Sequence, residues 1–529
     1  MKTKANSILV MTIILIAILV VINLVSSLFY FRLDFSKGRL FKLGKASRDA
    51  VSGLTENMIV KVYASKDLPN SLLGINRYLK DLLAEYQQHS KRKFDFEYVS
   101  NTTTEVFNAQ AQATGLKFIV YQTYDEQDQV AYKQAIFGLS IEYKGKITVL
   151  SINPAMESKL EYEITSRIQQ ITETGLPVVA VFADSTYQSM KADYFEESME
   201  RNYKVFQTDL TSYPNGAEAL VFVGVLDSLS NLQLLNLDQY MMRGGKVVFL
   251  QERITPDAYG LNEIPSNIFR FLDHYGLRVM PNVVLDYVCD YRTGISSAMR
   301  SPYPVHPIVK GSDKNIITRN MNNIVLYLAS QIEFSGDPGK LTFEPILQTS
   351  YNSALLAGPN FFPDMRLFQN PTPEMFPLTS LTVGALIKGK QRSFFQGTDL
   401  QKLPNFIAEN DSVSIVLFSD SEIIVNPDKE QYLNRYNIVL NAIDYLIGKN
   451  SMISIRSRSI ESSEFDIRKY LENKQAGSVF INEKEQLLKQ HIKLSIITIP
   501  ILLLALFGLL VYIHQYRNKQ QIRQMYEKK

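Results

Sequence analysis

The sequence contains few of the residues that catalytic and metal-binding sites require. It has one cysteine, Cys289, which excludes an internal disulfide and a thiolate metal cluster because both need at least two thiols. The five histidines lie far apart and include no pair at i, i+4 spacing, so the local pattern of a histidine metal site is absent. No serine stands in the G-x-S-x-G pattern of a nucleophile elbow. We therefore expect no catalytic residue, metal or cofactor, and a buried or idle thiol at Cys289.

An excess of charge of either sign is also lacking. The 56 lysine and arginine residues nearly balance the 53 aspartate and glutamate residues, which leaves a net charge of +3. Neither a basic field nor a zinc-finger spacing supports binding to nucleic acid, so we expect no nucleic-acid partner. The apolar content of 46% is ordinary for a globular protein, and the length predicts about three domains.

Charged residues are absent from two long apolar stretches, 8–30 and 494–513. Each is long enough for a helix to cross a hydrocarbon layer of about 30 Å. We expect an N-terminal transmembrane anchor at residues 1–31 and a C-terminal transmembrane helix at residues 494–513. A cleaved signal peptide is the alternative for the first stretch, but the bulky residues 29–31 stand where small residues would precede a cleavage site.

The basic tail, residues 514–529, predicts that both termini are cytoplasmic. The long region between the spans is then periplasmic or otherwise extracytoplasmic, and the protein belongs to the inner (cytoplasmic) membrane. The basic juxtamembrane segment, residues 32–55, argues against this orientation, yet long loops translocate largely regardless of their charge. That segment either contacts lipid headgroups or forms a docking collar for a membrane partner.

The region between the spans predicts two α/β domains. Residues 56–175 alternate strand, helix and strand and include a hairpin at residues 143–146, which is typical of a thioredoxin-like α/β domain, here without C-x-x-C. Residues 176–450 contain apolar strands separated by helices, the pattern of a doubly wound α/β fold. The expected strands are LPVVAVFADS, ALVFVGV, KVVFLQE, NVVLDY and VSIVLFSD. Prolines and glycines predict an irregular insertion at residues 333–412, and residues 451–493 form a polar stalk.

The segment GALIKGKQ, residues 384–391, fits the phosphate-loop pattern G-x-x-x-x-G-K-[ST] except at its last position. Gln391 cannot supply the hydroxyl that holds magnesium in such a loop. Residues 381–395 alternate as in an extended hairpin with Gly389 and Lys390 near the bend, and not as a strand, a loop and a helix. We therefore expect no nucleotide site.

Carboxylates follow several expected strands of the second domain. Because open α/β sheets bind ligands beyond the carboxyl ends of their strands, these residues could surround a ligand crevice. The candidates are Asp184, Glu252, Asp286, Asp420 and Glu422. The alternative is that they cap helices and anchor loops, a common role for acidic residues at such positions.

Small and polar residues within the two spans mark places where another membrane helix can pack closely. The candidate permease contacts are Asn23 and Ser27 in the first span and Thr498, Ala505 and Gly508 in the second. Asn23 is the strongest candidate, since an amide that faces lipid is costly. The alternative is that such residues are merely tolerated in the membrane.

Six blocks in order along nearly the whole chain carry a resemblance to a known family. They are INLVSSLFYFRLDFSKGRLFKLGKASRDAVSGL, VKVYASKDLP, LDQYMMRGGKVVFL, FLDHYGLRVMPNVVLD, HPIV and NAIDYLIG. Together they resemble the GldG-like family of gliding-motility-associated ABC transporter auxiliary or substrate-binding subunits. Where that family tends to carry D-G-D after its last sheet strand, this chain has Asp420, Ser421 and Glu422.

The resemblance implies an extracytoplasmic subunit that associates with a separate ABC permease subunit and a separate cytoplasmic ATPase subunit. It also implies a link to gliding motility or surface secretion, and a glutamine-amidotransferase-like second domain that has lost its catalytic residues. We therefore expect a non-enzymatic, membrane-anchored auxiliary (substrate-binding-like) subunit, whose tethering at both ends holds it beside its permease at high effective concentration. The alternative is a structural scaffold of a cell-envelope complex that binds protein or polymer. An anchored hydrolase would lack a visible nucleophile and base.

Overall fold

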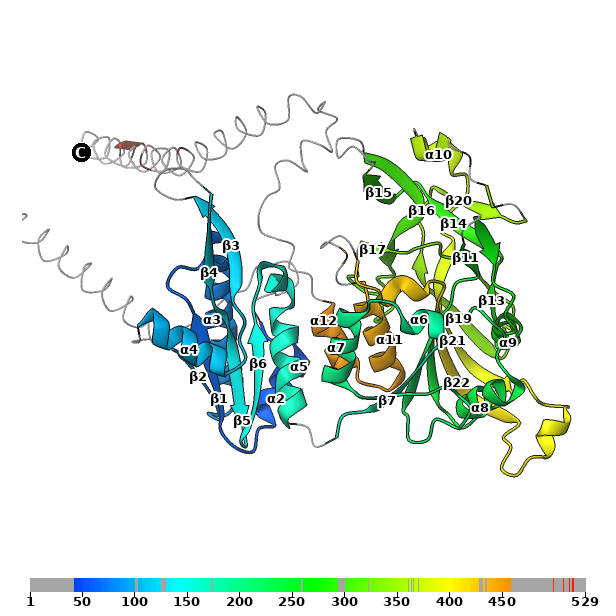
Figure 1. Cartoon of the computed structure of the whole chain (residues 1–529), viewed down its shortest axis with the longest axis horizontal. Coiled ribbons are helices and arrows are strands. Elements are labelled where there is room, and N and C mark those ends of the chain that lie inside the picture. The colour runs from blue at the N-terminus through cyan, green and yellow to red at the C-terminus, as the bar shows by residue number, and fades with distance from the viewer. Residues whose placement is uncertain are drawn as a thin grey trace, which may run out of the picture. The chain divides into compact units, whose positions relative to one another are not determined.

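The computed structural model describes the chain from residue 42 to residue 457 with short gaps, together with isolated positions near the C-terminus (Figure 1). The gaps are 100–102, 125–129, 173–174, 258–259, 294–299, 322, 360, 363, 365, 370, 428–431 and 433–434, and the isolated positions are 498, 508, 513, 516 and 517. The chain divides into two units, Met1–Ser459 and Ile460–Lys529. The elements below all belong to the first unit.

The predicted membrane segments lie largely outside the described residues. This holds for the whole anchor at residues 1–31 and for nearly all of the stalk, the second span and the tail. In the part of the chain that the structure describes, no helix is long and apolar enough to cross a bilayer. The two spans and the orientation of the chain therefore stay predictions.

The first domain has a four-stranded sheet in the order β2-β1-β5-β6. Its strands are β1 (Met58–Ala64), β2 (Phe94–Tyr98), β5 (Phe137–Tyr143) and β6 (Lys146–Ser151). Helix α3 (Asn70–His89) connects β1 to the parallel strand β2, whereas β5 is antiparallel to both of its neighbours. Lys144 and Gly145 adopt positive φ in the tight β5–β6 turn, which confirms the predicted hairpin.

Helices cover both faces of this sheet. The apolar stripe that the sequence predicts on α3 is buried and packs with α5 (Leu160–Thr172) against one face. Helix α4 (Thr104–Ala113) covers the other face, where Phe107 packs against Tyr63 of β1. Helix α2 (Lys45–Ser52) adds Val51 to the first of these cores. The hairpin of β3 (Ile119–Tyr124) and β4 (Val130–Ala135) stands apart from the sheet.

The second domain is built on a large mixed sheet whose parallel part has the order β8-β7-β9-β10-β22. These strands are β7 (Val178–Ala183), β8 (Lys204–Gln207), β9 (Ala219–Val223), β10 (Lys246–Leu250) and β22 (Glu409–Phe418). Four of the five expected apolar strands lie here, which confirms their assignment. They are almost wholly apolar because both faces of the sheet are covered, and every residue of β9 is buried.

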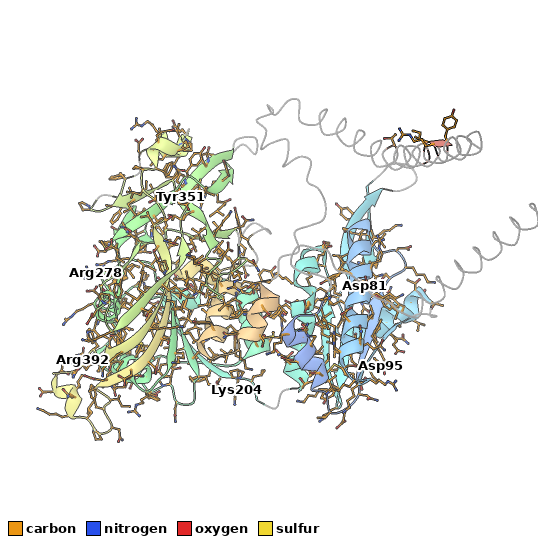
Figure 2. All side chains as sticks on the ribbon, turned by 180° about the vertical axis from the view of Figure 1, so that it is seen from behind. Asp81, Asp95, Lys204, Arg278, Tyr351 and Arg392 are labelled. Atoms are coloured by element: carbon orange, nitrogen blue, oxygen red, sulfur yellow. The ribbon has the colours of Figure 1, made fainter. Side chains whose placement is uncertain are left out.

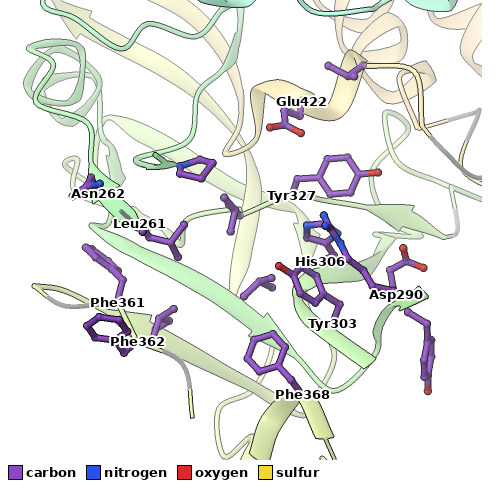
Figure 3. Close-up of a pocket in the computed structure, with 18 of the residues that line it drawn as sticks. Leu261, Asn262, Asp290, Tyr303, His306, Tyr327, Phe361, Phe362, Phe368 and Glu422 are labelled. Atoms are coloured by element: carbon purple, nitrogen blue, oxygen red, sulfur yellow. The ribbon is translucent and has the colours of Figure 1, made fainter. Parts of the chain in front are cut away.

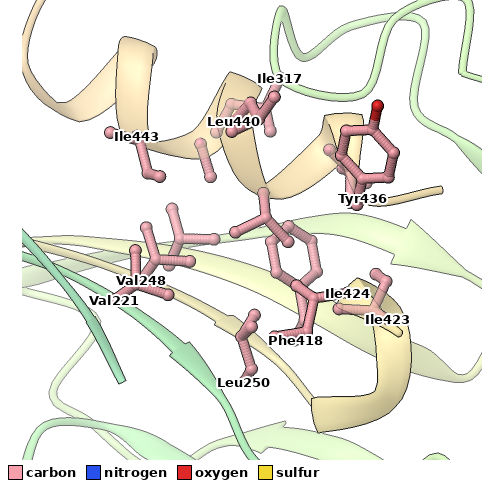
Figure 4. Close-up of a cluster of buried hydrophobic side chains, with 14 of the residues drawn as sticks. Val221, Val248, Leu250, Ile317, Phe418, Ile423, Ile424, Tyr436, Leu440 and Ile443 are labelled. Carbon is pink, nitrogen blue, oxygen red and sulfur yellow. The ribbon is translucent and has the colours of Figure 1, made fainter. Parts of the chain in front are cut away.

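Successive residues of each parallel strand point into opposite cores. Val248 and Leu250 of β10 face one core, whereas Val247 and Phe249 face the other. The covering helices are α7 (Asp193–Asn202) and α11 (Asn437–Leu446) on the first face, and α8 (Asn231–Met242) and α9 (Ile268–His274) on the second. Figure 4 shows Leu440 of α11 stacked over the sheet residues of the first core. Every residue of α11 except Tyr445 is buried.

Beyond β22 the sheet continues in antiparallel strands. They are β21 (Thr382–Arg392), β19 (Leu341–Gln348), β16 (Arg300–Gly311) and β15 (Cys289–Thr293), with β17 (Ile324–Val325) beside β16. The expectation of an irregular insertion at residues 333–412 is therefore corrected. The prolines and glycines that suggested it lie mainly in the loops between these strands, and Pro345 lies at an irregularity of β19.

The segment GALIKGKQ is part of the single strand β21, so the predicted hairpin is wrong. β21 pairs with β19 on one side and with β22 on the other, and its register shifts between Gly389 and Gln391. Lys390 forms ion pairs with Glu409 and Asp411. A hairpin and a straight strand share the same alternation of side chains, which is why the pattern did not distinguish them. The segment has neither the loop nor the following helix of a phosphate site.

The expected strand NVVLDY also differs from its prediction. It forms β14 (Asn282–Asp286), which pairs with β20 (Ser353–Ala357) in a separate two-stranded antiparallel sheet and not in the parallel sheet. An apolar run does not specify its pairing partner. β14 and β20 help to build a small third core around Leu285, Leu356 and Phe376.

The remaining short elements connect these parts. They are α6 (Ser185–Gln188), β11 (Ile254–Pro256), β12 (Leu261–Glu263), β13 (Leu277–Val279), β18 (Ile332–Phe334), α10 (Arg366–Gln369) and α12 (Asn450–Arg456). Figure 2 draws the side chains of the described residues on these elements.

Candidate functional site

A cavity of about 1180 Å³ lies beside the third core. Its walls come from segments far apart in the sequence, including β12, β15, β16, β20 and the 3₁₀ turn η4 (Ser421–Ile424) after β22 (Figure 3). Pro359, Phe361, Phe362 and Phe368, which follow β20, also line it. Because β22 is a central parallel strand, η4 places this pocket beyond the carboxyl end of the sheet. Open α/β sheets bind their ligands at this edge.

Aromatic rings form much of the wall. The ring centroids of Tyr303 and His306 lie 4.7 Å apart, and those of His306 and Tyr327 lie 4.4 Å apart. Figure 3 shows these three rings together, with Phe361 and Phe362 across the space from them. Rings in such contact hold one another in place and offer flat apolar faces to a ligand.

Two arginines lie against the rings in different surroundings. The guanidinium of Arg435 is 4.2 Å from the ring centroid of Tyr327, and this arginine is almost fully buried. Its Nη2 donates to two backbone carbonyls in or just after η4, at 2.8 and 2.9 Å. The guanidinium of Arg292 lies 4.5 Å from the ring centroid of Tyr303 and is exposed. Arg435 thus stabilises the pocket wall from the buried side, whereas the exposed Arg292 can contact a ligand in the pocket.

Glu422 brings a carboxyl group to the pocket. Burial raises the pKa of Glu422, the charge of Glu252 acts in the same direction, and Arg435 and Arg292 oppose them; the net effect is a pKa above the ordinary value. Glu422 therefore accepts a proton more readily than an exposed glutamate does. Such a group can accept or donate a hydrogen bond to a ligand.

Glu252 and Asp184 both follow parallel strands, and both are bound by protein groups. Glu252 accepts hydrogen bonds from the Tyr187 hydroxyl at 2.5 Å and from the backbone N–H of Ser421 at 2.8 Å. Asp184 caps α6 by accepting a hydrogen bond from the backbone N–H of Thr186 at 2.7 Å. These carboxylates have the loop-anchoring and capping geometry that was the alternative to ligand contact.

Asp420 and Asp286 are fully or almost fully buried. Asp420 accepts hydrogen bonds from the backbone N–H groups of Tyr327 at 2.7 Å and Glu422 at 2.9 Å, and burial raises its pKa well above the ordinary value. Asp286 lies on β14, in a different sheet, and accepts hydrogen bonds from the backbone N–H and the hydroxyl of Ser350, each at 2.6 Å. Of the five predicted crevice residues, Glu422 is the one that lines the pocket.

A family model described as an ABC-type uncharacterized transport system matches residues 167–442, which is more than half of the chain. The chain belongs to this family. The match is consistent with the GldG-like resemblance of the sequence. A second model, a domain of unknown function, matches residues 37–142.

An uncharacterized protein of Borreliella burgdorferi is similar to this transport-family chain over nearly its whole length. The two are 23% identical over 533 aligned residues, which cover 96% of this chain and 98% of the relative. Two solved structures are more distant. The mmIFT52 N-terminal domain aligns with 13% identity over 51% of this chain and 96% of its own, with a TM-score of 0.33. A β-galactosidase from Rahnella sp. R3 aligns with 8% identity over 70% of this chain and 56% of its own, with a TM-score of 0.27. Scores this low support no inference about the fold.

Sequence reasoning missed most of the pocket residues of this transport-family protein. Many of the aromatic lining residues come from two short stretches in which tyrosine, phenylalanine and histidine are frequent, namely Tyr291, Tyr303 and His306 in one and Phe361, Phe362 and Phe368 in the other, whereas Tyr327 and Tyr432 lie outside them. That local density of rings is the signal that could have found them. The carboxylate pattern predicted Glu422, but it could not show which carboxyl ends of strands lie close to the aromatic rings.

Cys289 is buried, as expected, and burial raises the pKa of its thiol to about 11. Within the described residues, no group of three or more histidine, cysteine, aspartate or glutamate side chains is arranged to hold a metal ion. Of the predicted permease contacts, Asn23, Ser27 and Ala505 lie outside the described residues. Thr498 and Gly508 are described only as isolated positions, so these contacts stay predictions.

Proposed function

We propose that this protein is a membrane-anchored, extracytoplasmic auxiliary subunit of an ABC transporter complex, and that its pocket receives a ligand without transforming it. The observation that carries the proposal is a pocket of about 1180 Å³ at the carboxyl edge of the parallel sheet, in a member of an ABC-type transport family. Apolar and aromatic walls with a few polar groups are the usual composition of a ligand site. The rings together with Glu422 and Arg292 suit a ligand that has both apolar faces and hydrogen-bonding groups.

The proposal includes a finer description of the fold. The order β2-β1-β5-β6, with one parallel pair followed by two antiparallel pairs, supports a thioredoxin-like first domain. The parallel strands with helices on both faces support a doubly wound, glutamine-amidotransferase-like second domain. In this proposal the second domain has kept its ligand-binding edge and works without catalysis.

Two spans, at residues 1–31 and 494–513, would hold the described domains outside the cytoplasm beside a permease, while a separate cytoplasmic subunit hydrolyses ATP. Asn23, Ser27, Thr498, Ala505 and Gly508 would contact the permease. Their support is the apolar sequence of the two stretches and the small or polar character of these residues. Purification of the full chain in mild detergent should recover a multi-span permease and an ATPase with it. Recovery of neither subunit would contradict the transporter proposal.

The pocket can be tested with a panel of neutral saccharides, amino acids and short peptides. A ligand that binds the folded protein raises its unfolding temperature by mass action. Phe362→Ala should abolish that rise without lowering basal stability, because Phe362 lines the pocket but is 81% exposed. Tyr351→Ala is the matched control, since Tyr351 is 79% exposed and lies outside the pocket lining. Equal responses in both variants would place binding elsewhere.

A scaffold that binds protein or polymer is the second candidate, and one observation favours it. Several large apolar side chains near the pocket are exposed, which is unusual unless they meet a partner. They are Tyr287 at 40%, Val288 at 46%, Tyr291 at 51% and Phe362 at 81% exposure. A scaffold should bind a macromolecule through these residues and show no stabilisation by any small solute.

The resemblance extends the proposal to gliding motility or surface secretion. Deletion of the gene in its own organism should then impair surface movement or the export of a surface component. Expression of the intact chain should restore it, and expression of the Phe362→Ala variant should not. A deletion strain with normal movement and normal export would remove this part of the proposal and leave the transporter role open.

A further inference from the structure

The buried side chain of Arg456 binds α12 to helices α11 and α5. Arg456 Nη2 donates to Asp444 at 2.7 Å and Nη1 donates to the side-chain oxygen of Asn441 at 2.8 Å, both on α11. Its guanidinium also lies 4.8 Å from the ring centroid of Tyr162 on α5. The Arg456 side chain is 1% exposed. A buried charge held in this way is costly to release.

Helix α5 also holds the first described helix, α2. Glu161 Oε1 accepts hydrogen bonds from the backbone N–H of Gly44 and from the Ser47 hydroxyl, each at 2.6 Å. Ala46, Tyr162, Met452 and Ile455 form a small apolar cluster that joins α2, α5 and α12. Helices α2 and α12, which are far apart in the sequence, therefore both pack on α5. We call the contacts among α2, α5 and α12, together with the hydrogen bonds from Arg456 to α11, the terminal clasp.

The opposite end of α11 reaches the pocket. Arg435, two residues before α11 begins, binds carbonyl oxygens in and after η4 and lies against the ring of Tyr327, as described above. Both Tyr327 and Glu422 line the pocket. One helix of ten residues, about 15 Å long at 1.5 Å per residue, thus has the terminal clasp at its C-terminal end and the pocket wall at its N-terminal end.

A second set of polar contacts connects α5, through α7, to Tyr436 at the start of α11. On α5, Glu163 accepts a hydrogen bond from Arg201 of α7 at 2.6 Å. One turn earlier on α7, the Ser198 hydroxyl donates to the hydroxyl of Tyr436 at 3.3 Å, and Tyr436 follows Arg435 directly. Buried polar contacts therefore join α5 to α7, and α7 to the residue directly before α11, while α7 and α11 also share the first apolar core.

We propose that α11 couples the pocket to the terminal clasp, so that a change in the hold on α2 and α12 changes the pocket wall through Arg435. Because such coupling is reciprocal in free energy, occupation of the pocket would in turn bias the clasp. α11 can act in this way because it is buried almost all round and charged contacts hold both of its ends. The proposal deepens the proposed function, since it gives the pocket a route to the helices nearest the two predicted spans.

Hydrogen exchange measured by mass spectrometry on the full-length protein in detergent tests the coupling without any ligand. The backbone N–H groups of Tyr327, Ser421, Glu422 and Val425 are hydrogen-bonded, so their exchange reports opening of the pocket wall. Arg456→Gln should speed exchange in residues 421–427 and 325–328 by roughly tenfold, which corresponds to the loss of one hydrogen bond to a charged group. Arg456→Lys, which keeps the charge but not both bonds, should give a smaller increase and serves if the first variant does not fold.

Asp238→Asn is the control, because Asp238 lies on α8 behind the opposite face of the sheet. It accepts hydrogen bonds from the Tyr275 hydroxyl at 2.5 Å, from the Ser393 hydroxyl at 2.6 Å and from the backbone N–H of Phe394 at 2.7 Å. This variant should speed exchange near residues 393–396 and leave residues 421–427 unchanged. Faster exchange that stays within residues 441–457 in both Arg456 variants would overturn the coupling. That result would leave the transporter proposal standing, and a failure to find a transporter would leave the exchange result standing.

Discussion

Single residues show where backbone geometry, more than composition, decides stability. Gly389 has a φ of +139°, and a Cβ built there would lie 2.1 Å from the carbonyl oxygen of Lys340. Gly389→Ala should therefore lower the free energy of unfolding by about 1–3 kcal/mol. Gly74, in the exposed face of α3, has no atom within 4 Å of its built Cβ, so Gly74→Ala should raise it by roughly 0.5–1 kcal/mol. Chemical denaturation of both variants checks the prediction, and equal shifts would contradict it.

Glu163 is a residue whose charge should matter to stability in a pH-dependent way. Burial alone would raise the pKa of Glu163, but Arg201 and Arg167 outweigh it, so the pKa lies below its ordinary value of 4.5. A lowered pKa contributes stability that is present above the unfolded-state value and is lost as pH falls through the folded-state value. Glu163→Gln should cost about 3–5 kcal/mol near pH 7, because it leaves the buried Arg167 without its carboxylate and Arg201 with only the exposed Glu197.

The difference between Glu163→Gln and the wild type should narrow as the pH falls below about 4.5, first because the carboxyl takes up a proton in the unfolded chain and finally, below its lowered pKa, because it does so in the folded protein. Denaturation curves recorded from pH 7 down to the acid limit of the fold measure this. Glu197→Gln is the control, since Glu197 also binds Arg201, at 3.1 Å, but its side chain is 67% exposed. A cost that is constant with pH would contradict the role of the Glu163 charge.

Helices and strands differ in how far local sequence specifies them. Helix α8 begins at a capping box, in which the Ser230 side chain accepts from the backbone N–H of Gln233 while the Gln233 side chain accepts from the backbone N–H of Ser230. Ser230→Ala should cost about 1 kcal/mol of stability, whereas Ser230→Gly should cost only a few tenths. Thermal unfolding of the two variants separates a lost cap from a general effect of truncation. Equal losses would show that the cap contributes little.

The same contrast explains which elements could be predicted. The stripe on α3 and the apolar strands β7, β9, β10 and β22 follow from side-chain periodicity, which is a local property. The partner of β14 and the continuation of β21 as one strand do not, because pairing depends on residues far away in the chain. For the same reason, only part of the pocket could be predicted from the sequence. Glu422 follows from its position after a strand, whereas Tyr327 reaches the ring of His306, which Tyr303 also contacts, only because β16 and the segment after β17 lie side by side.

The proposed arrangement of the whole molecule across the membrane can be tested with its single cysteine removed. In a Cys289→Ser background, Tyr351→Cys places a thiol at a position that is 79% exposed. A membrane-impermeant maleimide added to spheroplasts should label it before lysis if the described domains are extracytoplasmic. Arg517→Cys in the predicted cytoplasmic tail should be labelled only after the membrane is permeabilised. The reverse pattern would contradict the orientation and, with it, the proposed approach of a ligand from outside the cytoplasm.

The sequence by itself determined the apolar stretches at both ends, the apolar stripe of α3, the strands β7, β9, β10 and β22, and the carboxylates at the strand ends, because each of these depends on neighbouring residues. Only the tertiary structure decided which strands pair, which carboxylates anchor loops and which one lines a pocket, and that the first and last described helices meet on α5. These features depend on contacts between residues more than a hundred positions apart, such as Glu252 with Ser421 or Tyr162 with Arg456. Local periodicity specifies which way a side chain points, but it does not specify what the side chain will meet.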